Sequence, residues 1–108
     1  MKDIYWEGSS LRDVSQFTKP VKRLIGYELM RLQSALEPMD WKPMRSVGKG
    51  VREIRIHHDN EYRVLYVTHI QDSIHVLHVF VKKTQKTAKR DLDLAKQRYQ
   101  ALLKKRGK

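Results

Sequence analysis

The spacing of apolar residues changes twice along the chain, from helical to strand-like and back to helical. Between residues 18 and 38 the apolar side chains recur every three to four positions, which is the spacing of one helix face. They are Val21, Leu24, Ile25, Leu29, Leu32 and Leu36. Thr18 and Pro20 suit the start of this helix. Backbone amides in the first turn have no partner within the helix, so proline, which lacks its amide hydrogen, is tolerated there. Pro38 is expected to end it.

Shorter elements are predicted on either side of this helix. Asp3–Glu7 has the residue types of a short strand, and Ser10 with Asp13 has the capping-box spacing that starts a short helix. Residues 37–50 contain two prolines and two glycines and are predicted to form a loop.

Beyond residue 50 the pattern becomes that of β-strands. The predicted strands are Val51–His57, Tyr62–Thr68 and Ile74–Lys82. Their connections are short enough for hairpins, so the strands should form an antiparallel meander. After Thr87, a plausible cap, helical spacing returns in Ala88, Leu92, Ala95, Tyr99 and Leu102. The sequence therefore predicts one α+β domain over residues 1–108, in the order β-α-α-β-β-β-α. Its small, mainly antiparallel, twisted sheet should carry its helices on one face.

Alternation along the predicted strands sorts their side chains onto two faces. The apolar set, expected to pack against the helices, is Ile54, Ile56, Val64, Tyr66, Leu77, Val79 and Val81. The opposite face collects Glu53, Arg55, Arg63, His78, Phe80 and Lys82. Three permanent cations and a histidine beside an aromatic ring are costly to hold together unless an anion binds there.

The distribution of charge favours a polyanionic partner. The formal net charge is +11, and residues 82–108 hold 11 Lys and Arg against 2 Asp and Glu. Such a segment is typical of contact with RNA, DNA or an acidic protein surface. The alternative is a solvated basic helix that serves solubility alone.

Other classes of protein are not favoured by the sequence. The chain has no cysteine, and its five histidines lack metal-binding spacing, so no metal site or cofactor is expected. The N-terminal residues show no signal peptide, and the apolar run Ile74–Val81 is too short to cross a bilayer. We expect a cytoplasmic protein without a membrane partner.

The polar face also fits cleavage of RNA, whose 2′-hydroxyl is a built-in nucleophile. Such a reaction needs a base, an acid and cations that stabilise the charge on the phosphorane. On this hypothesis Arg55 and Arg63 stabilise the transition state, and Lys82 or His78 transfers protons.

Structural interpretations of the same residues stay open. Arg55 would then form a surface salt bridge near Glu53, His78 would be a hydrogen-bonded sheet residue, and Phe80 would belong to the core. The Lys82–Thr87 segment would be either a solvated connection or a phosphate-binding loop at a helix N-terminus.

Four segments together resemble one protein family. They are V-G-K-G-V-R-E-I-R-I (Val47–Ile56), E-Y-R-V-L-Y-V (Glu61–Val67), V-L-H-V-F-V-K-K-T-Q-K-T (Val76–Thr87) and A-K-Q-R-Y (Ala95–Tyr99). In this order they resemble the phage-derived, HigB-like branch of the RelE/ParE toxin superfamily. The resemblance implies a RelE-like fold and the toxin of a type II toxin–antitoxin pair. It also implies ribosome-dependent cleavage of mRNA and inhibition by a helix-turn-helix, HigA-like antitoxin.

The resemblance places the recurring polar and aromatic positions at Arg55, Arg63, Phe80 and Lys82. The candidate RNA-binding residues are Lys49, Phe80, Lys83, Lys86, Arg90 and Tyr99. RelE-type toxins often present a tyrosine near the C-terminus for base stacking, whereas the last tyrosine here lies inside a predicted helix. Phe80 is therefore the first candidate for stacking and Tyr99 the second.

Two other functions compete with mRNA cleavage. ParE-like members of the superfamily inhibit DNA gyrase, although a binding-only inhibitor does not need Arg55, Arg63 and Lys82 together. A non-catalytic phage regulator would instead bind nucleic acid through residues 82–108.

Overall fold

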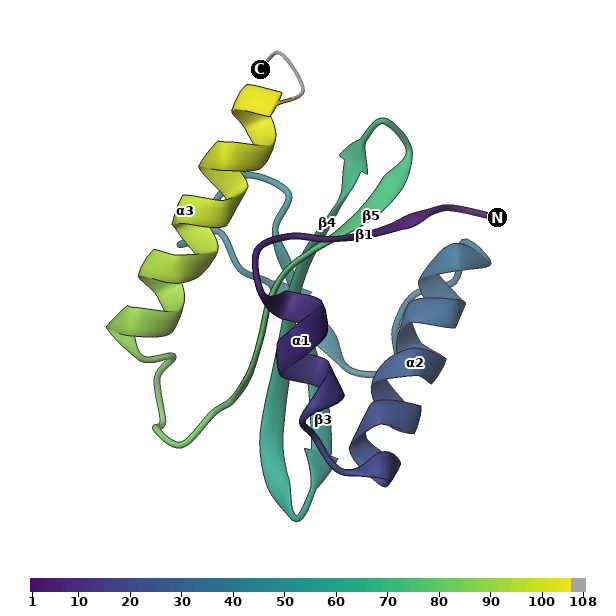
Figure 1. The fold of residues 1–108 in the computed structure, drawn as a ribbon, viewed down its shortest axis with the longest axis vertical. Helices are drawn as coiled ribbons and strands as arrows, with labels where there is room; N and C mark the ends of the chain where they lie inside the picture. The colour runs from purple at the N-terminus through teal and green to yellow at the C-terminus, as the bar shows by residue number, and fades with distance from the viewer. Residues whose placement is uncertain (106–108) are drawn as a thin grey trace.

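A computed structural model describes residues 1–105 and shows a five-stranded sheet with helices on both faces (Figure 1). The spatial order of the strands is β1-β5-β4-β3-β2, in which β1 and β5 are parallel and the other neighbours antiparallel. The strands are β1 (Ile4–Trp6), β2 (Trp41–Pro43), β3 (Arg52–His58), β4 (Asn60–Ile70) and β5 (Ser73–Val81). The helices are α1 (Ser10–Ser15), α2 (Lys19–Gln33) and α3 (Lys89–Lys105). The predicted α+β class and antiparallel meander are confirmed.

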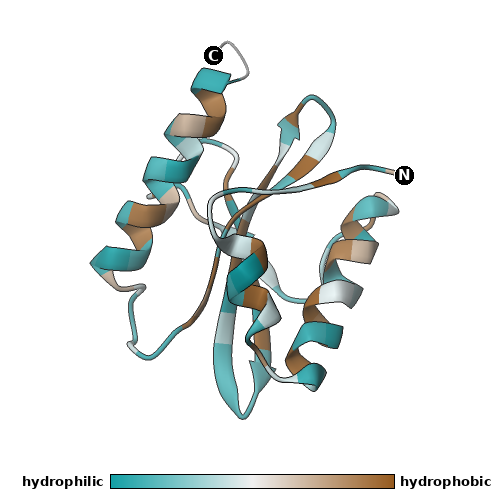
Figure 2. Cartoon of the chain, viewed as in Figure 1, coloured by the Kyte–Doolittle hydropathy of each residue, from teal (hydrophilic) through white to brown (hydrophobic). Residues whose placement is uncertain are grey.

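The prediction that all helices lie on one face of the sheet is wrong. Along β4, Tyr62, Val64 and Tyr66 join a core with α1 and α2, whereas Leu65 and Val67 join a second core with α3. Both faces of β4 are therefore apolar and each needs a cover. In Figure 2 apolar and polar residues alternate around α3, which buries Ala95, Tyr99 and Leu102.

Two irregularities separate the observed elements from the predicted ones. The predicted loop 37–50 contains β2, which pairs with β3 at the sheet edge. In β5, Leu77 is an extra residue, because Leu65 pairs with His78 while Tyr66 pairs with Val76. This β-bulge turns Leu77 to the α3 side instead of the expected side of Val79.

The predicted helix boundaries also shift. The residue before α1 is Ser9, whereas the sequence predicted Ser10 in that place. The Ser10 hydroxyl donates to the Val76 carbonyl instead. The long helix ends at Gln33, before Pro38, and leaves Leu36 half exposed outside it. Thr87 was the predicted cap of α3, but the first hydrogen bonds of this helix are accepted by the carbonyl of Ala88.

Polar contacts attach α3 to β5 and to the segment between β1 and α1. Arg98 donates to the Leu77 carbonyl at 3.0 Å and to the Ser9 hydroxyl at 2.8 Å, and Lys105 lies 3.3 Å from Glu7. The end of the sheet at the β3–β4 hairpin keeps exposed polar side chains on this face, among them His57. No helix within residues 1–105 is long and apolar enough to cross a membrane.

Candidate active site at the β3–β4 hairpin

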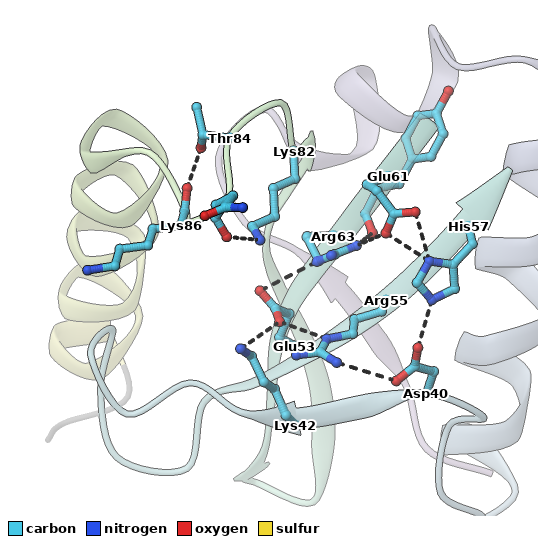
Figure 3. Close-up of polar contacts among 12 residues, drawn as sticks. Asp40, Lys42, Glu53, Arg55, His57, Glu61, Arg63, Lys82, Thr84 and Lys86 are labelled. Atoms are coloured by element: carbon cyan, nitrogen blue, oxygen red, sulfur yellow. Dashed lines mark hydrogen bonds and ion pairs between the residues drawn. The ribbon is translucent and has the colours of Figure 1, made fainter. Parts of the chain in front are cut away.

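Three cations converge on one buried carboxylate on the α3 side of the sheet (Figure 3). Glu53 in β3 is 1 % exposed, and its oxygens lie 4.0 Å from Lys42, 3.5 Å from Arg55 and 3.8 Å from Arg63. Burying a carboxylate is costly unless nearby cations compensate its lost hydration. Glu53 thus fixes the side chains of two arginines from adjacent strands.

Beside this group, His57 lies between two carboxylates. Its Nε2 is 2.7 Å from Asp40 Oδ2 and its Nδ1 is 2.8 Å from Glu61 Oε1. Glu61 is the direct cross-strand partner of His57, and Asp40 immediately precedes β2. The hydrogen bonds to Asp40 and Glu61 raise the pKa of His57 above its ordinary value of 6.5. Only the imidazolium can donate from both ring nitrogens, so this geometry fits the protonated ring.

The same two carboxylates connect His57 to the arginines. Arg63 donates to Glu61 at 3.0 Å and to the Tyr62 carbonyl at 2.9 Å, and Arg55 lies 4.0 Å from Asp40. The side chain of Arg55 is 33 % exposed and that of Arg63 only 8 %. Arg55 is therefore the guanidinium open to a substrate, whereas Arg63 holds Glu61 in place.

Lys82 and the loop after β5 border this cluster. The Lys82 amide donates to the Glu61 carbonyl at 2.7 Å, and its ammonium donates to the Gln85 carbonyl. Thr84 turns its hydroxyl onto the Lys86 carbonyl. Between this loop and the start of α3 lies a pocket of about 330 Å³. Its lining includes Phe80, Lys82, Lys83, Thr84, Arg90 and Asp91. The predicted phosphate-binding loop thus encloses a concave surface rich in cations.

His78 and Phe80 lie on the same sheet face beneath α3, with Phe80 directly across from Arg63, whereas Tyr99 lies on α3 next to Lys49. His78 is 5 % exposed, stacks on Phe80 with ring centres 4.8 Å apart, and contacts Asp91 at 2.8 Å. Burial lowers the pKa of His78, although the hydrogen bond to Asp91 opposes that change. Phe80 is 8 % exposed and Tyr99 4 %, so neither ring offers an open stacking surface. The Tyr99 hydroxyl donates to the carbonyl of Lys49, which precedes β3.

Sequence reasoning did not identify Asp40, Lys42, His57 and Glu61 as site residues. The pairing of His57 with Glu61 could have been predicted, because a turn at residues 59–60 places these two residues directly across from each other. Asp40 and Lys42 depend on β2, which was not predicted. Among residues 1–105, no group of three or more His, Cys, Asp or Glu side chains is arranged to hold a metal ion.

The chain was compared with known protein families. Residues 12–100 match the family described as phage derived protein Gp49-like (DUF891). The matched region includes the lysine-rich loop after β5 and all the charged residues described above, which are Asp40, Lys42, Glu53, Arg55, His57, Glu61 and Arg63. No curated protein sequence matches the chain.

Proposed function

The chain belongs to the phage-derived Gp49-like family, which is related to the RelE-like toxins of toxin–antitoxin systems, and on this premise we propose that it is a toxin that cuts mRNA. The observation that carries the proposal is the placement of His57 between Asp40 and Glu61, next to the partly exposed Arg55. An acid, two carboxylates and a phosphate-binding cation then share one open surface. Substrate selection through the translating ribosome is part of the same proposal.

The proposed reaction uses the nucleophile of the RNA itself. The 2′-oxygen attacks the adjacent phosphorus, the bond from phosphorus to the 5′-oxygen breaks, and a 2′,3′-cyclic phosphate and a 5′-hydroxyl result. Asp40 or Glu61 accepts the 2′ proton, and protonated His57 donates one to the departing 5′-oxygen. Because His57 is hydrogen-bonded to both carboxylates, the accepted proton can return to the ring.

Cations stabilise the charge that develops on the phosphorane. Arg55 presents a partly exposed guanidinium beside His57, and Lys82 lies at the same end of the sheet. Guanidinium groups bind phosphate oxygens in pairs, and fixed donors of this kind stabilise a transition state without reorganising. Arg63 acts through Glu61 and Glu53 as a positioning residue.

The test is cleavage of a translated mRNA by purified ribosomes and purified protein, with the new 5′ ends mapped. We expect His57→Ala to lower the rate by roughly 100- to 10,000-fold, as for loss of a general acid. Arg55→Ala should also lower it strongly. Asp40→Asn and Glu61→Gln distinguish the two candidate bases, because the variant that removes the base should lose more activity.

Two neighbouring residues provide matched controls. His58→Ala removes the adjacent histidine, which alternation places on the other sheet face, and Arg52→Ala removes an arginine that stacks on Trp41 at 4.3 Å. Both should keep the wild-type rate. Full activity of His57→Ala or Arg55→Ala would refute the assigned site. Induction in bacteria that lack the antitoxin tests the two alternatives. Growth arrest with DNA damage but no new RNA ends would favour a gyrase inhibitor, and no arrest would favour a binding protein or an inactive copy.

The proposal includes a helix-turn-helix antitoxin as partner. An acidic segment laid over the exposed cations near Arg55 and Lys82 would neutralise their charge and block the site. Coexpression with the neighbouring gene product should abolish toxicity and give a complex that copurifies. Toxicity that persists with that product present would contradict this partner.

A further inference from the structure

A larger pocket lies on the same sheet face, beyond the other end of the α3 core. Its volume is about 780 Å³, within the range of sites for small organic groups. The lining includes Gly48, Lys49, His69, Ile70, Tyr99 and Leu103. None of the seven charged residues of the hairpin site lines it; these are Asp40, Lys42, Glu53, Arg55, His57, Glu61 and Arg63.

Two glycines before β3 give this pocket its shape. A Cβ atom on Gly48 would lie 2.3 Å from the ring of Tyr99, and one on Gly50 would lie 2.7 Å from the ring of His69. Gly50 also has a φ of +80°, which disfavours any other residue. The turn at residues 48–50 is therefore closely fitted to both rings.

Hydrogen bonds hold these rings in place. The Tyr99 hydroxyl donates to the Lys49 carbonyl at 2.6 Å and lies 3.3 Å from His69 Nε2. Both rings line the pocket, the Tyr99 ring as a buried residue and His69 as an exposed one. His69 lines the pocket together with the apolar side chains of Ile70 and Leu103.

The pocket combines the features that recognise a nucleotide. Lys49 is exposed, and within residues 1–105 its ammonium has no ion-pair partner. A flat ring and apolar walls suit an unpaired base, and a neighbouring lysine suits its phosphate. A smaller pocket of about 300 Å³ shares Lys49 and His69 with it.

We propose that this pocket binds one unpaired base of an RNA strand whose phosphate backbone extends to the Arg55 cluster. Arg63 and His69 are six residues apart on β4, which corresponds to about 20 Å of strand. The bound base would thus lie a few nucleotides from the phosphate at Arg55. This assignment rests on the proposed action on RNA and adds to it a recognition site remote from the chemistry.

The test measures binding without cleavage. A single strand of about twelve 2′-O-methyl nucleotides lacks the nucleophile, and an abasic strand of equal length has the same phosphates. We expect wild-type protein to bind the strand with bases roughly 5- to 100-fold more tightly, by fluorescence anisotropy. His69→Ala should bring this ratio close to one, and Lys49→Ala should weaken binding of both strands.

Matched variants separate the pocket from general effects. Tyr27→Ala removes an exposed ring from α2, on the other side of the sheet, and should keep the wild-type ratio. Circular dichroism should show that His69→Ala, a surface change, leaves the fold intact. An unchanged ratio in folded His69→Ala would overturn the proposal.

Titrations that monitor the NMR signal of the His69 ring distinguish an RNA strand from the other possible occupants of the pocket. The strand should shift this signal at lower concentrations than adenosine 5′-monophosphate does. Saturation by the mononucleotide that the strand cannot displace would overturn the strand assignment in favour of a free nucleotide. A signal that shifts with protein concentration alone would overturn it in favour of a second copy of the chain.

The pocket and the nuclease can fail separately. His69-dependent base binding by a protein that cuts no mRNA would contradict the proposed reaction and leave the pocket assignment standing. Cleavage of mRNA with a base preference that does not depend on His69 would contradict the pocket alone.

Discussion

At the scale of single residues, Glu53 is the group on which the arginine cluster depends. Glu53→Gln leaves the buried guanidinium of Arg63 with a neutral amide on one side, so we expect it to lower the free energy of unfolding by about 3 kcal/mol. Urea denaturation at neutral pH measures this change. Asp93→Asn makes the same carboxyl-to-amide change in the exposed pair with Lys89 and should cost much less, because solvent screens exposed ion pairs. Equal costs would contradict the role of Glu53 as the buried counter-charge.

The sequence predicted which residues share the polar face, but not how open each one is. A period of two along each strand was enough to group Glu53, Arg55 and Arg63, because that grouping depends only on local backbone geometry. Exposure depends on distant segments. Arg63 is enclosed by contacts with Glu53, Glu61 and the Tyr62 carbonyl, which no pattern along one strand reveals.

At the scale of elements, the long amphipathic segments were predictable and the short or doubly buried ones were not. β2 has three residues and ends in Pro43, so it shows no alternation and contains a residue that only an edge strand tolerates. The position of α3 depended on recognising that Leu65 and Leu77 are buried on the face opposite to Val64. The bulge at Leu77 concealed that face, because it breaks the period of two.

The contact between β5 and α3 makes stability depend on pH. Burial lowers the pKa of His78 below 6.5 in the folded protein, even with Asp91 at 2.8 Å. As the pH falls below about 6.5, the unfolded chain takes up this proton before the folded protein does, so folding becomes less favourable. Wild type should therefore lose more stability than His78→Gln between about pH 7.5 and pH 5 in urea denaturation. Equal losses would show that His78 titrates alike in both states.

His57 acts in the opposite direction. Its pKa is raised in the folded protein, so its stabilising contribution is present below about pH 6.5 and is lost as the pH rises through the folded-state pKa. Because His57 is unchanged in both proteins, comparing wild type with His78→Gln cancels its contribution. Hydrogen bonds to carboxylates thus raise the pKa of the exposed His57, whereas burial lowers the pKa of His78.

At the scale of the whole molecule, the two faces of the sheet differ in their polar chemistry. On one face, α1 and α2 cover a continuous apolar core. The other face has the arginine cluster and the pocket at His69 at opposite ends, with the α3 core between them. A nucleic acid that contacts both sites would run along this face. The basic segment 82–90, which spans the loop after β5 and the start of α3, is the densest group of cations near the arginines.

This arrangement predicts where the salt dependence of RNA binding originates. Each phosphate contact on a single strand contributes about −0.7 to the slope of log affinity against log salt concentration. Changing Lys83, Lys86 and Arg90 to glutamine should therefore make the slope for the 2′-O-methyl strand shallower by about 2, measured between about 50 and 300 mM KCl. Changing Lys19, Lys22 and Arg23 on α2 to glutamine removes the same charge from the other side of the sheet and should leave the slope almost unchanged. Equal effects of the two triple variants would mean that the net charge of the protein, rather than the surface around the loop, attracts the RNA.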